Sequence, residues 1–383
     1  MNKTKRLPRL APGRLCFTVL GAFCILLLLF YAEGGIKAAQ QGLLLCGRTV
    51  IPALFPFMVA SELLVGCGGA ALIGTILAKP MQFLLGIPGA AACPVVLGAL
   101  CGFPTGARTM AALYDKGELS AAQCTRLLTF INNPSSAYMI SAVGASLLGS
   151  RRMGLLLWII SLLCAFLTAC ATRFLMPDDT RHAQSAPQPL QIGAHVFTSA
   201  IGSAAQSMLS VCAYVVFFSA VLGAVQSACE GLAIPPTLNA VLYGIMEMSG
   251  GIAKATQIGN PTKAAVLCAA LSCFSGISVM CQIITVCHGR GFGFWPYVLA
   301  KIAQSVLAAA MTWLAICYLL PLLPPEDMSA GLLLPEGTTK IVITVANASF
   351  GIACVALMWR KAKRHLARWS ADVQSISSTD RVP

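Results

Sequence analysis

The residues best suited to chemistry lie where apolar stretches of the chain are interrupted. The first interruption runs from Gly102 to Arg108 and contains Pro104, which has no amide hydrogen, and two glycines with wide backbone freedom. The next residues predict a new helix over 107–114 that ends at Gly117. A helix that starts within a membrane directs unpaired amides and the positive end of its dipole into the gap, and Arg108 adds a full charge there.

Interrupted helices survive in a membrane only where they line a cavity, and there they commonly bind an anionic substrate. The alternative is a loop between two ordinary helices, with Arg108 at the membrane surface. The stretch alone leaves both interpretations open.

A second interruption follows at Asn132–Ser136, with two amides, Pro134 and two hydroxyls between apolar flanks. The preceding helix carries Arg126 and is predicted to open at a capping box formed by Ser120 and Gln123. The polar side chains either bind a ligand or satisfy the backbone groups that Pro134 frees, and we favour the ligand role.

The second half repeats this plan. Glu247–Ile252 superposes on Gly102–Ala107 at a shift of 145 residues, from 102 to 247. Leu271–Ser278 falls on Leu128–Ser135 at a shift of 143, from 128 to 271. Paired interruptions in two halves indicate an internal duplication with a transport site near the middle of the membrane.

Acidic residues in apolar runs are costly and should face other helices or water, unless they lie near the interface. Glu62 is one such residue. Glu247 either binds a cation, carries a proton or pairs with a basic residue, and Lys254, two turns further along, is the candidate partner. The predicted substrate-binding residues are Gly102, Phe103, Pro104, Thr105, Gly106, Arg108, Asn132, Asn133, Ser135, Glu247, Ser249, Gly250 and Ser275.

Composition sets the fold class. The 383 residues are 57% hydrophobic and only 10% charged, so we expect an all-α polytopic membrane protein with about eight to ten spans, some of them interrupted helices or re-entrant hairpins. The 17 cysteines form no Cys-x-x-Cys pair and act as small apolar residues, so no metal site is expected. No catalytic arrangement is present either, and we expect no enzyme activity.

The net charge of +13 is concentrated at the two ends of the chain. The positive-inside rule then places both termini in the cytoplasm and requires an even number of crossings. Basic clusters beside membrane helices set topology and contact anionic lipid, so nucleic acid is not an expected partner.

Six segments are expected along the chain. The first half of the repeat is preceded by a basic terminus, a first membrane helix and a polar link over 33–48, and a break is expected at Lys79-Pro80. The segments are 1–46 (basic terminus, first membrane helix and link), 47–176 (first half), 177–192 (polar linker), 193–323 (second half), 324–359 (link and last membrane helix) and 360–383 (basic cytoplasmic tail).

The motifs Ile51-Pro-Ala-Leu-Phe-Pro-Phe, Ser61-Glu-Leu-Leu, Gly102-Phe-Pro-Thr-Gly-Ala and Phe130-Ile-Asn-Asn-Pro-Ser resemble the sporulation integral membrane protein family of the YlbJ type. That family belongs to a larger group with a nucleoside-recognition (Gate) domain, distantly similar to concentrative nucleoside transporters. The resemblance covers about 47–320 and implies transport of dipicolinic acid across a forespore membrane. Arg108 and the asparagine amides suit the two carboxylates of that solute.

Two other functions stay open. A transporter of a nucleoside or another organic solute would use Asn132, Asn133 and Glu247 to recognise hydroxyls and ring nitrogens. A membrane protein that assembles a sporulation complex would transport nothing. No cofactor is expected, coupling to sodium or protons is open, and the sequence gives no oligomeric state.

Overall fold

The computed structural model describes residues 12–176, 194–231 and 233–319, and these residues form helices and no strand. The predicted linker (177–192) and the predicted last membrane helix and tail lie outside this range. The elements are α1 (Pro12–Phe30), α2 (Ala32–Leu45), η1 (Cys46–Val50), α3 (Ile51–Gly66), α4 (Gly69–Pro80), η2 (Met81–Leu85), η3 (Gly89–Ala91), α5 (Ala92–Leu100), α6 (Thr105–Asp115), α7 (Ala121–Ile131), η4 (Tyr138–Leu147), α8 (Arg151–Leu175), α9 (Ala194–Ala228), α10 (Pro236–Met246), α11 (Met248–Ala255), α12 (Pro261–Phe274), α13 (Gly276–Cys287), α14 (Trp295–Leu314) and η5 (Ala315–Leu319).

Within the described ranges, five helical stretches are long and apolar enough to cross a membrane: Ala32–Gly66, Arg151–Leu175, His195–Ala228, Pro261–Cys287 and Trp295–Leu319. A sixth is the bent pair Gly69–Leu85 and Gly89–Leu100 if it forms one span. The prediction of an all-α polytopic membrane protein is therefore confirmed. The count of eight to ten stays a prediction, because part of it falls outside the described residues.

Two local predictions were wrong. The stretch after α1 is helix α2 and not a link, because Gly34, Gly35 and Gly42 let it pack closely against α9. Lys79-Pro80 does not break the chain, since α4 continues past Pro80 into the π-helical turn η2. A proline removes only its own amide hydrogen, and a wider turn accommodates that loss. The chain bends instead between η2 and η3, by 100°.

The first interruption forms a hairpin of α5 and α6. The two helices come close because Gly98 and Gly106 face each other: a Cβ on Gly106 would lie 2.9 Å from the Cα of Gly98. Gly102 turns the chain in the left-handed region, at φ 81°, and the peptide bond before Pro104 is cis. The predicted helix break and restart are both confirmed.

The second half contains the matching hairpin of α10 and α11. A Cβ on Gly251 would overlap the backbone of Gly244, so these two glycines repeat the contact between Gly98 and Gly106. Glu247 stands between the helices in extended backbone. The next helices also correspond, because α7 ends at Ile131 and α12 at Phe274, a shift of 143 residues (131 to 274). Common ancestry of the two halves stays a prediction.

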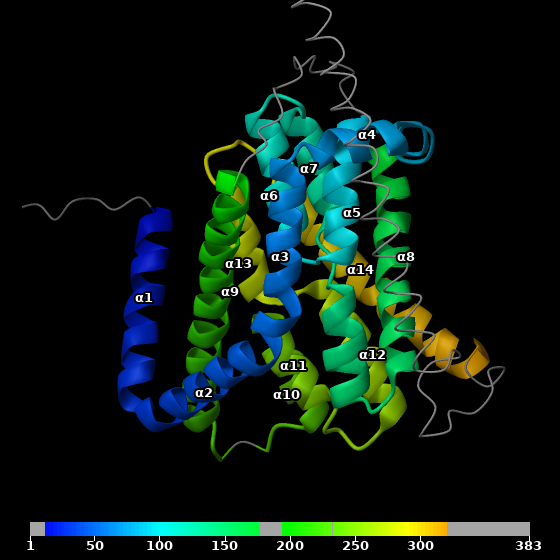
Figure 1. Cartoon of the computed structure of the whole chain (residues 1–383). Coiled ribbons are helices and arrows are strands. Elements are labelled where there is room, and N and C mark those ends of the chain that lie inside the picture. Colours follow the sequence, from blue (N-terminus) through cyan, green and yellow to red (C-terminus); the bar gives the residue numbers. More distant parts are fainter. Residues whose placement is uncertain (1–11, 177–193, 232, 320–383) are drawn as a thin grey trace, which may run out of the picture. The chain divides into compact units, whose positions relative to one another are not determined.

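The two halves run in opposite directions. Asp115, at the end of α6, pairs with Arg290, just after α13, at 2.7 Å, and Thr125 of α7 accepts a bond from the Gly293 amide. The hydrogen bond from Arg290 lowers the pKa of the Asp115 carboxyl. At the other end, Leu148 after η4 packs in one cluster with Ile258 between α11 and α12. Figure 1 accordingly shows α6 and α7 in its upper part and α10, α11 and α12 in its lower part.

Candidate functional site

The four interruptions of the chain meet in two pairs. The Phe103 amide donates to the Asn133 carbonyl at 3.0 Å, which joins the first interruption to the second. The third interruption is at Glu247, between α10 and α11, and the fourth is at Ser275, between α12 and α13. A Cβ on Gly276 would lie 3.1 Å from both the Gly244 carbonyl oxygen and the Met248 amide nitrogen, so these two interruptions also lie together. Extended backbone at membrane depth is tolerated where it is buried in protein or lines a cavity.

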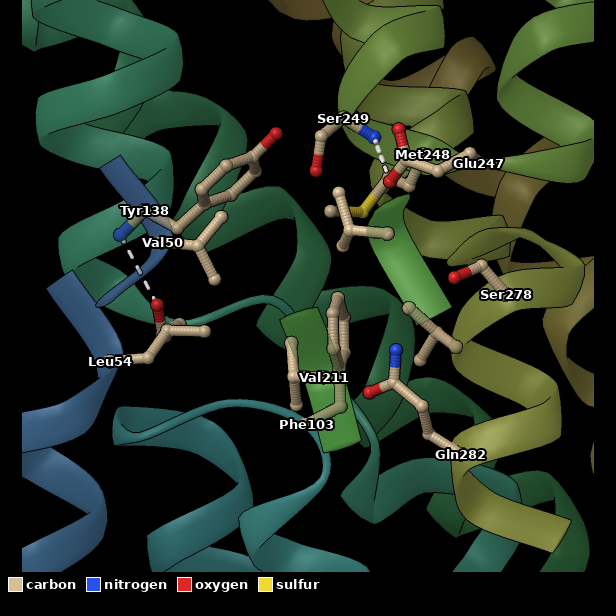
Figure 2. A pocket seen from close by; sticks show the side chains of 13 residues that line it. Val50, Leu54, Phe103, Tyr138, Val211, Glu247, Met248, Ser249, Ser278 and Gln282 are labelled. Carbon is tan, nitrogen blue, oxygen red and sulfur yellow. Dashed lines mark hydrogen bonds between the residues drawn. The ribbon is translucent and has the colours of Figure 1, made fainter. Parts of the chain in front are cut away.

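Both pairs line one small pocket (Figure 2). Polar residues of both halves contribute to the pocket. Apolar side chains from η1, α3, α9 and the hairpins form the rest of its wall. The lining residues are Val50, Leu54, Phe103, Ser135, Tyr138, Val211, Val215, Glu247, Met248, Ser249, Ser278, Val279 and Gln282. The pocket therefore lies between the two halves, as the repeat predicts.

Glu247 is the only acidic side chain among these lining residues and is 3% exposed. Its carboxylate is the N-cap of α11: Oε1 accepts from the Ser249 amide at 3.0 Å and Oε2 from the Gly250 amide at 2.6 Å. A negative charge at a helix N-terminus is favourable. The alternative of an ion pair with Lys254 is not formed, because Lys254 contacts Gln226 at 3.4 Å and the ring of Tyr243 at 4.0 Å.

Three further polar side chains of the pocket were missed from the sequence. Ser278 and Gln282 lie one turn apart on α13, and within the described part of the chain the Ser278 hydroxyl and the Gln282 Oε1 have no hydrogen-bond partner. Tyr138 directs its hydroxyl toward Ser249 across the pocket (Figure 2). The spacing of Ser278 and Gln282 on one helix face was the available signal. The Ser278 hydroxyl and the Gln282 Oε1 are therefore available to bind a polar solute.

Only some of the predicted residues line the pocket: Phe103, Ser135, Glu247 and Ser249. Gly102, Pro104, Thr105 and Gly106 form the turn and the start of α6 behind it, and Gly250 supplies an amide to Glu247. Asn132 and Asn133 turn back and donate to the carbonyls of Leu128 (3.3 Å) and Phe130 (2.8 Å), which satisfies freed backbone groups. Ser275 is fully buried in the left-handed region and does not line the pocket.

A fully buried cation, Lys301 of α14, was also missed. Its Nζ donates to the Asn132 carbonyl and, at 3.0 Å, to Oε1 of Gln304. Gln304 in turn donates to the Thr129 carbonyl at 2.9 Å. A positive charge at the C-terminus of a helix is favourable, so Lys301 and Gln304 together stabilise the buried C-terminal end of α7. The signal in the sequence was a lone lysine within an apolar span.

Arg108 lies outside the pocket. It pairs with Glu62 of α3 at 3.3 Å and donates to the Ser203 hydroxyl of α9 at 3.0 Å, with about a quarter of its side chain exposed. Glu62 thus faces other helices, as its position in an apolar run predicts. Leu54 on α3 and Val211 on α9 line the pocket. They lie eight positions along their helices from Glu62 and Ser203, which is about 12 Å at 1.5 Å per residue.

Neutralising the pair of Arg108 and Glu62 tests whether each residue serves mainly the other. Arg108→Gln and Glu62→Gln are each expected to lower thermal stability, and the double variant should lose less than the sum, with a coupling of about 0.5–1 kcal/mol. Thermal unfolding of the four proteins in detergent measures this. Strict additivity would show that Arg108 has another principal partner.

The described residues hold no cluster of three or more His, Cys, Asp and Glu side chains able to bind a metal ion. The expectation that the protein binds no metal and no cofactor stays a prediction. Among the described residues, the charged groups of the site are the carboxylate of Glu247 and, behind the second interruption, the ammonium group of Lys301.

Fold and site define a multi-pass α-helical membrane protein whose interrupted helices meet at one pocket. The chain is similar to the sporulation integral membrane protein YlbJ of Bacillus subtilis (strain 168), with 24% identity over 319 residues that cover 74% of this chain and 78% of the relative. The match confirms the resemblance to the YlbJ type. No family model and no solved structure matches the chain, so a nucleoside-recognition domain is not confirmed.

Proposed function

We propose that this protein moves a small organic solute across a membrane during endospore formation, with dipicolinic acid across the forespore outer membrane as the first candidate. The sporulation role is supported by the name of the relative, and the transport role by the pocket. The observation that carries the proposal is the meeting of four helix interruptions, two from each half, around that pocket. Inverted repeats with such sites are typical of secondary transporters.

The pocket has the chemistry for a flat aromatic solute. Phe103 and Tyr138 offer ring faces, and the Ser278 hydroxyl and the side-chain amide of Gln282 offer hydrogen-bond donors for carboxylate oxygens. The solute would pass unchanged, since the proposal requires no catalytic group.

A specific observation favours a second candidate, a nucleoside or another neutral polar solute. None of the lining residues carries a positive charge, and Arg108 is paired elsewhere. A carboxylate beside hydroxyls and an amide is suited to sugar hydroxyls and ring nitrogens. Dipicolinate carries two negative charges, so its binding beside Glu247 requires that the charge of Glu247 be neutralised.

Uptake into proteoliposomes separates the candidates. The protein is reconstituted into vesicles, and labelled dipicolinate and uridine are offered separately. Protein-free vesicles give the baseline. Dipicolinate uptake above the baseline is the expected result. Uridine uptake alone would replace dipicolinate by a nucleoside. Uptake of neither by folded protein would contradict transport and favour a role in assembling a sporulation complex.

A further inference from the structure

The charge on Glu247 has no compensating cation in the described part of the chain. Three basic side chains near the interruptions are held by other groups: Lys254 by Gln226 and Tyr243, Lys301 by Gln304 and a backbone carbonyl, and Arg108 by Glu62. Glu247 itself is almost fully buried and lines the pocket. A buried unpaired carboxylate is costly, and in membrane proteins such groups mark ion or proton pathways.

The hydrogen bonds of Glu247 hold its side chain in place whether or not it carries a proton. The amides of Ser249 and Gly250 each donate to a different carboxylate oxygen. The Ser249 hydroxyl also bonds to the carboxylate, so three of its four lone-pair sites are filled. The remaining site can take a proton without loss of an amide bond. The protonated group then has an O–H that it can donate to a solute carboxylate.

The other titratable groups around Glu247 do not supply the missing charge. Cys46 of η1 and Tyr138 of η4 lie within electrostatic range of the carboxylate. A thiol and a phenol are ordinarily neutral at pH 7 and become negative when they titrate. The other titratable groups on the elements that surround Glu247 include Cys212 (α9), Tyr243 (α10), Lys254 (α11), Cys268 (α12) and Cys281 (α13), and the exposed Arg48 of η1.

An anionic solute beside ionised Glu247 would place like charges together in a water-poor pocket. We propose that Glu247 takes up one proton when the anionic solute binds, so that the protein carries the solute and a proton together. The proton comes from water on the side where the solute enters, binds one carboxylate oxygen of Glu247, and returns to water on the side where the solute leaves. The inference rests on the proposed function, because it requires an anionic solute.

Proton uptake on binding is the direct test. Calorimetric titration of the purified protein with dipicolinate at one pH, in two buffers of different ionisation enthalpy, gives the number of protons bound per solute. The expected number is about one for the natural protein and zero for Glu247→Gln, whose amide mimics the protonated carboxyl. Glu230→Gln, an exposed acid in the turn after α9, is the matched control and should retain the uptake.

The pH dependence of flux gives the second measurement. Between roughly pH 8 and pH 6 the carboxyl groups of the solute stay ionised. Dipicolinate flux should rise as pH falls, by at most about tenfold per pH unit for one proton, and the flux of Glu247→Gln should be flat.

Dipicolinate binding or flux without proton uptake in the natural protein would overturn the inference and leave the proposed function intact. Unchanged proton uptake by a folded Glu247→Gln variant would also overturn the inference. So would dipicolinate flux that requires sodium in place of protons. Absence of both dipicolinate binding and flux would instead contradict the proposed function itself.

Discussion

Lys301→Met is expected to destabilise the protein by about 2 kcal/mol, because it leaves the Asn132 carbonyl and Oε1 of Gln304 buried without their donor. The loss corresponds to a fall of about 2–4 °C in the unfolding temperature, since the shift per kcal/mol becomes smaller as chain length grows. Solute flux should fall as well, since the end of α7 positions Ser135 in the pocket. Thermal unfolding in detergent and uptake into vesicles measure the two effects.

Lys254→Met is the matched control. Lys254 makes one long contact with Gln226 and lies over the ring of Tyr243, so its loss should change stability by about 1 kcal/mol or less. Equal effects of the two substitutions would mean that Lys301 does not hold the interruption in place.

Gly251→Ala is expected to destabilise the protein by about 1–3 kcal/mol through overpacking. The added Cβ would overlap the backbone of Gly244, and two helix backbones cannot yield as a flexible side chain does. Gly202→Ala, in the long helix α9, is the control, because a Cβ there meets nothing within 4 Å.

The two substitutions should act in opposite directions. An alanine in place of a helical glycine stabilises by roughly 0.5–1 kcal/mol when the space is free. Unfolding temperatures of Gly251→Ala and Gly202→Ala should therefore move down and up respectively. A rise for Gly251→Ala would show that α10 and α11 do not pack at their glycines.

The positions of the interruptions were predictable from the sequence because they depend on local chemistry. Pro104, Pro134 and the neighbouring glycines restrict or free the backbone wherever they occur. The capping box at Ser120 and Gln123 is likewise local, and both of its hydrogen bonds form. For the same reason, Glu247 beside Ser-Gly-Gly marked the third interruption.

The partners of the charged side chains were not predictable, because they depend on which helices meet. Arg108 begins a helix near the pocket, yet its side chain reaches Glu62 on α3, 46 residues earlier in the chain (108 to 62). Lys301 acts on an interruption 169 residues away. The roles of Ser278 and Gln282 depend on α13 lining the same pocket as Glu247, which is a tertiary arrangement.

Filling the pocket tests the central claim, that a solute passes where the four interruptions meet. Val211 lines the pocket from α9 and is 7% exposed, whereas Leu209, two residues before it, is 71% exposed. We expect Val211→Trp to reduce dipicolinate uptake into proteoliposomes to the level of protein-free vesicles. Leu209→Trp should retain the uptake of the natural protein. Full uptake by a folded Val211→Trp variant would contradict the account and place the path of the solute elsewhere.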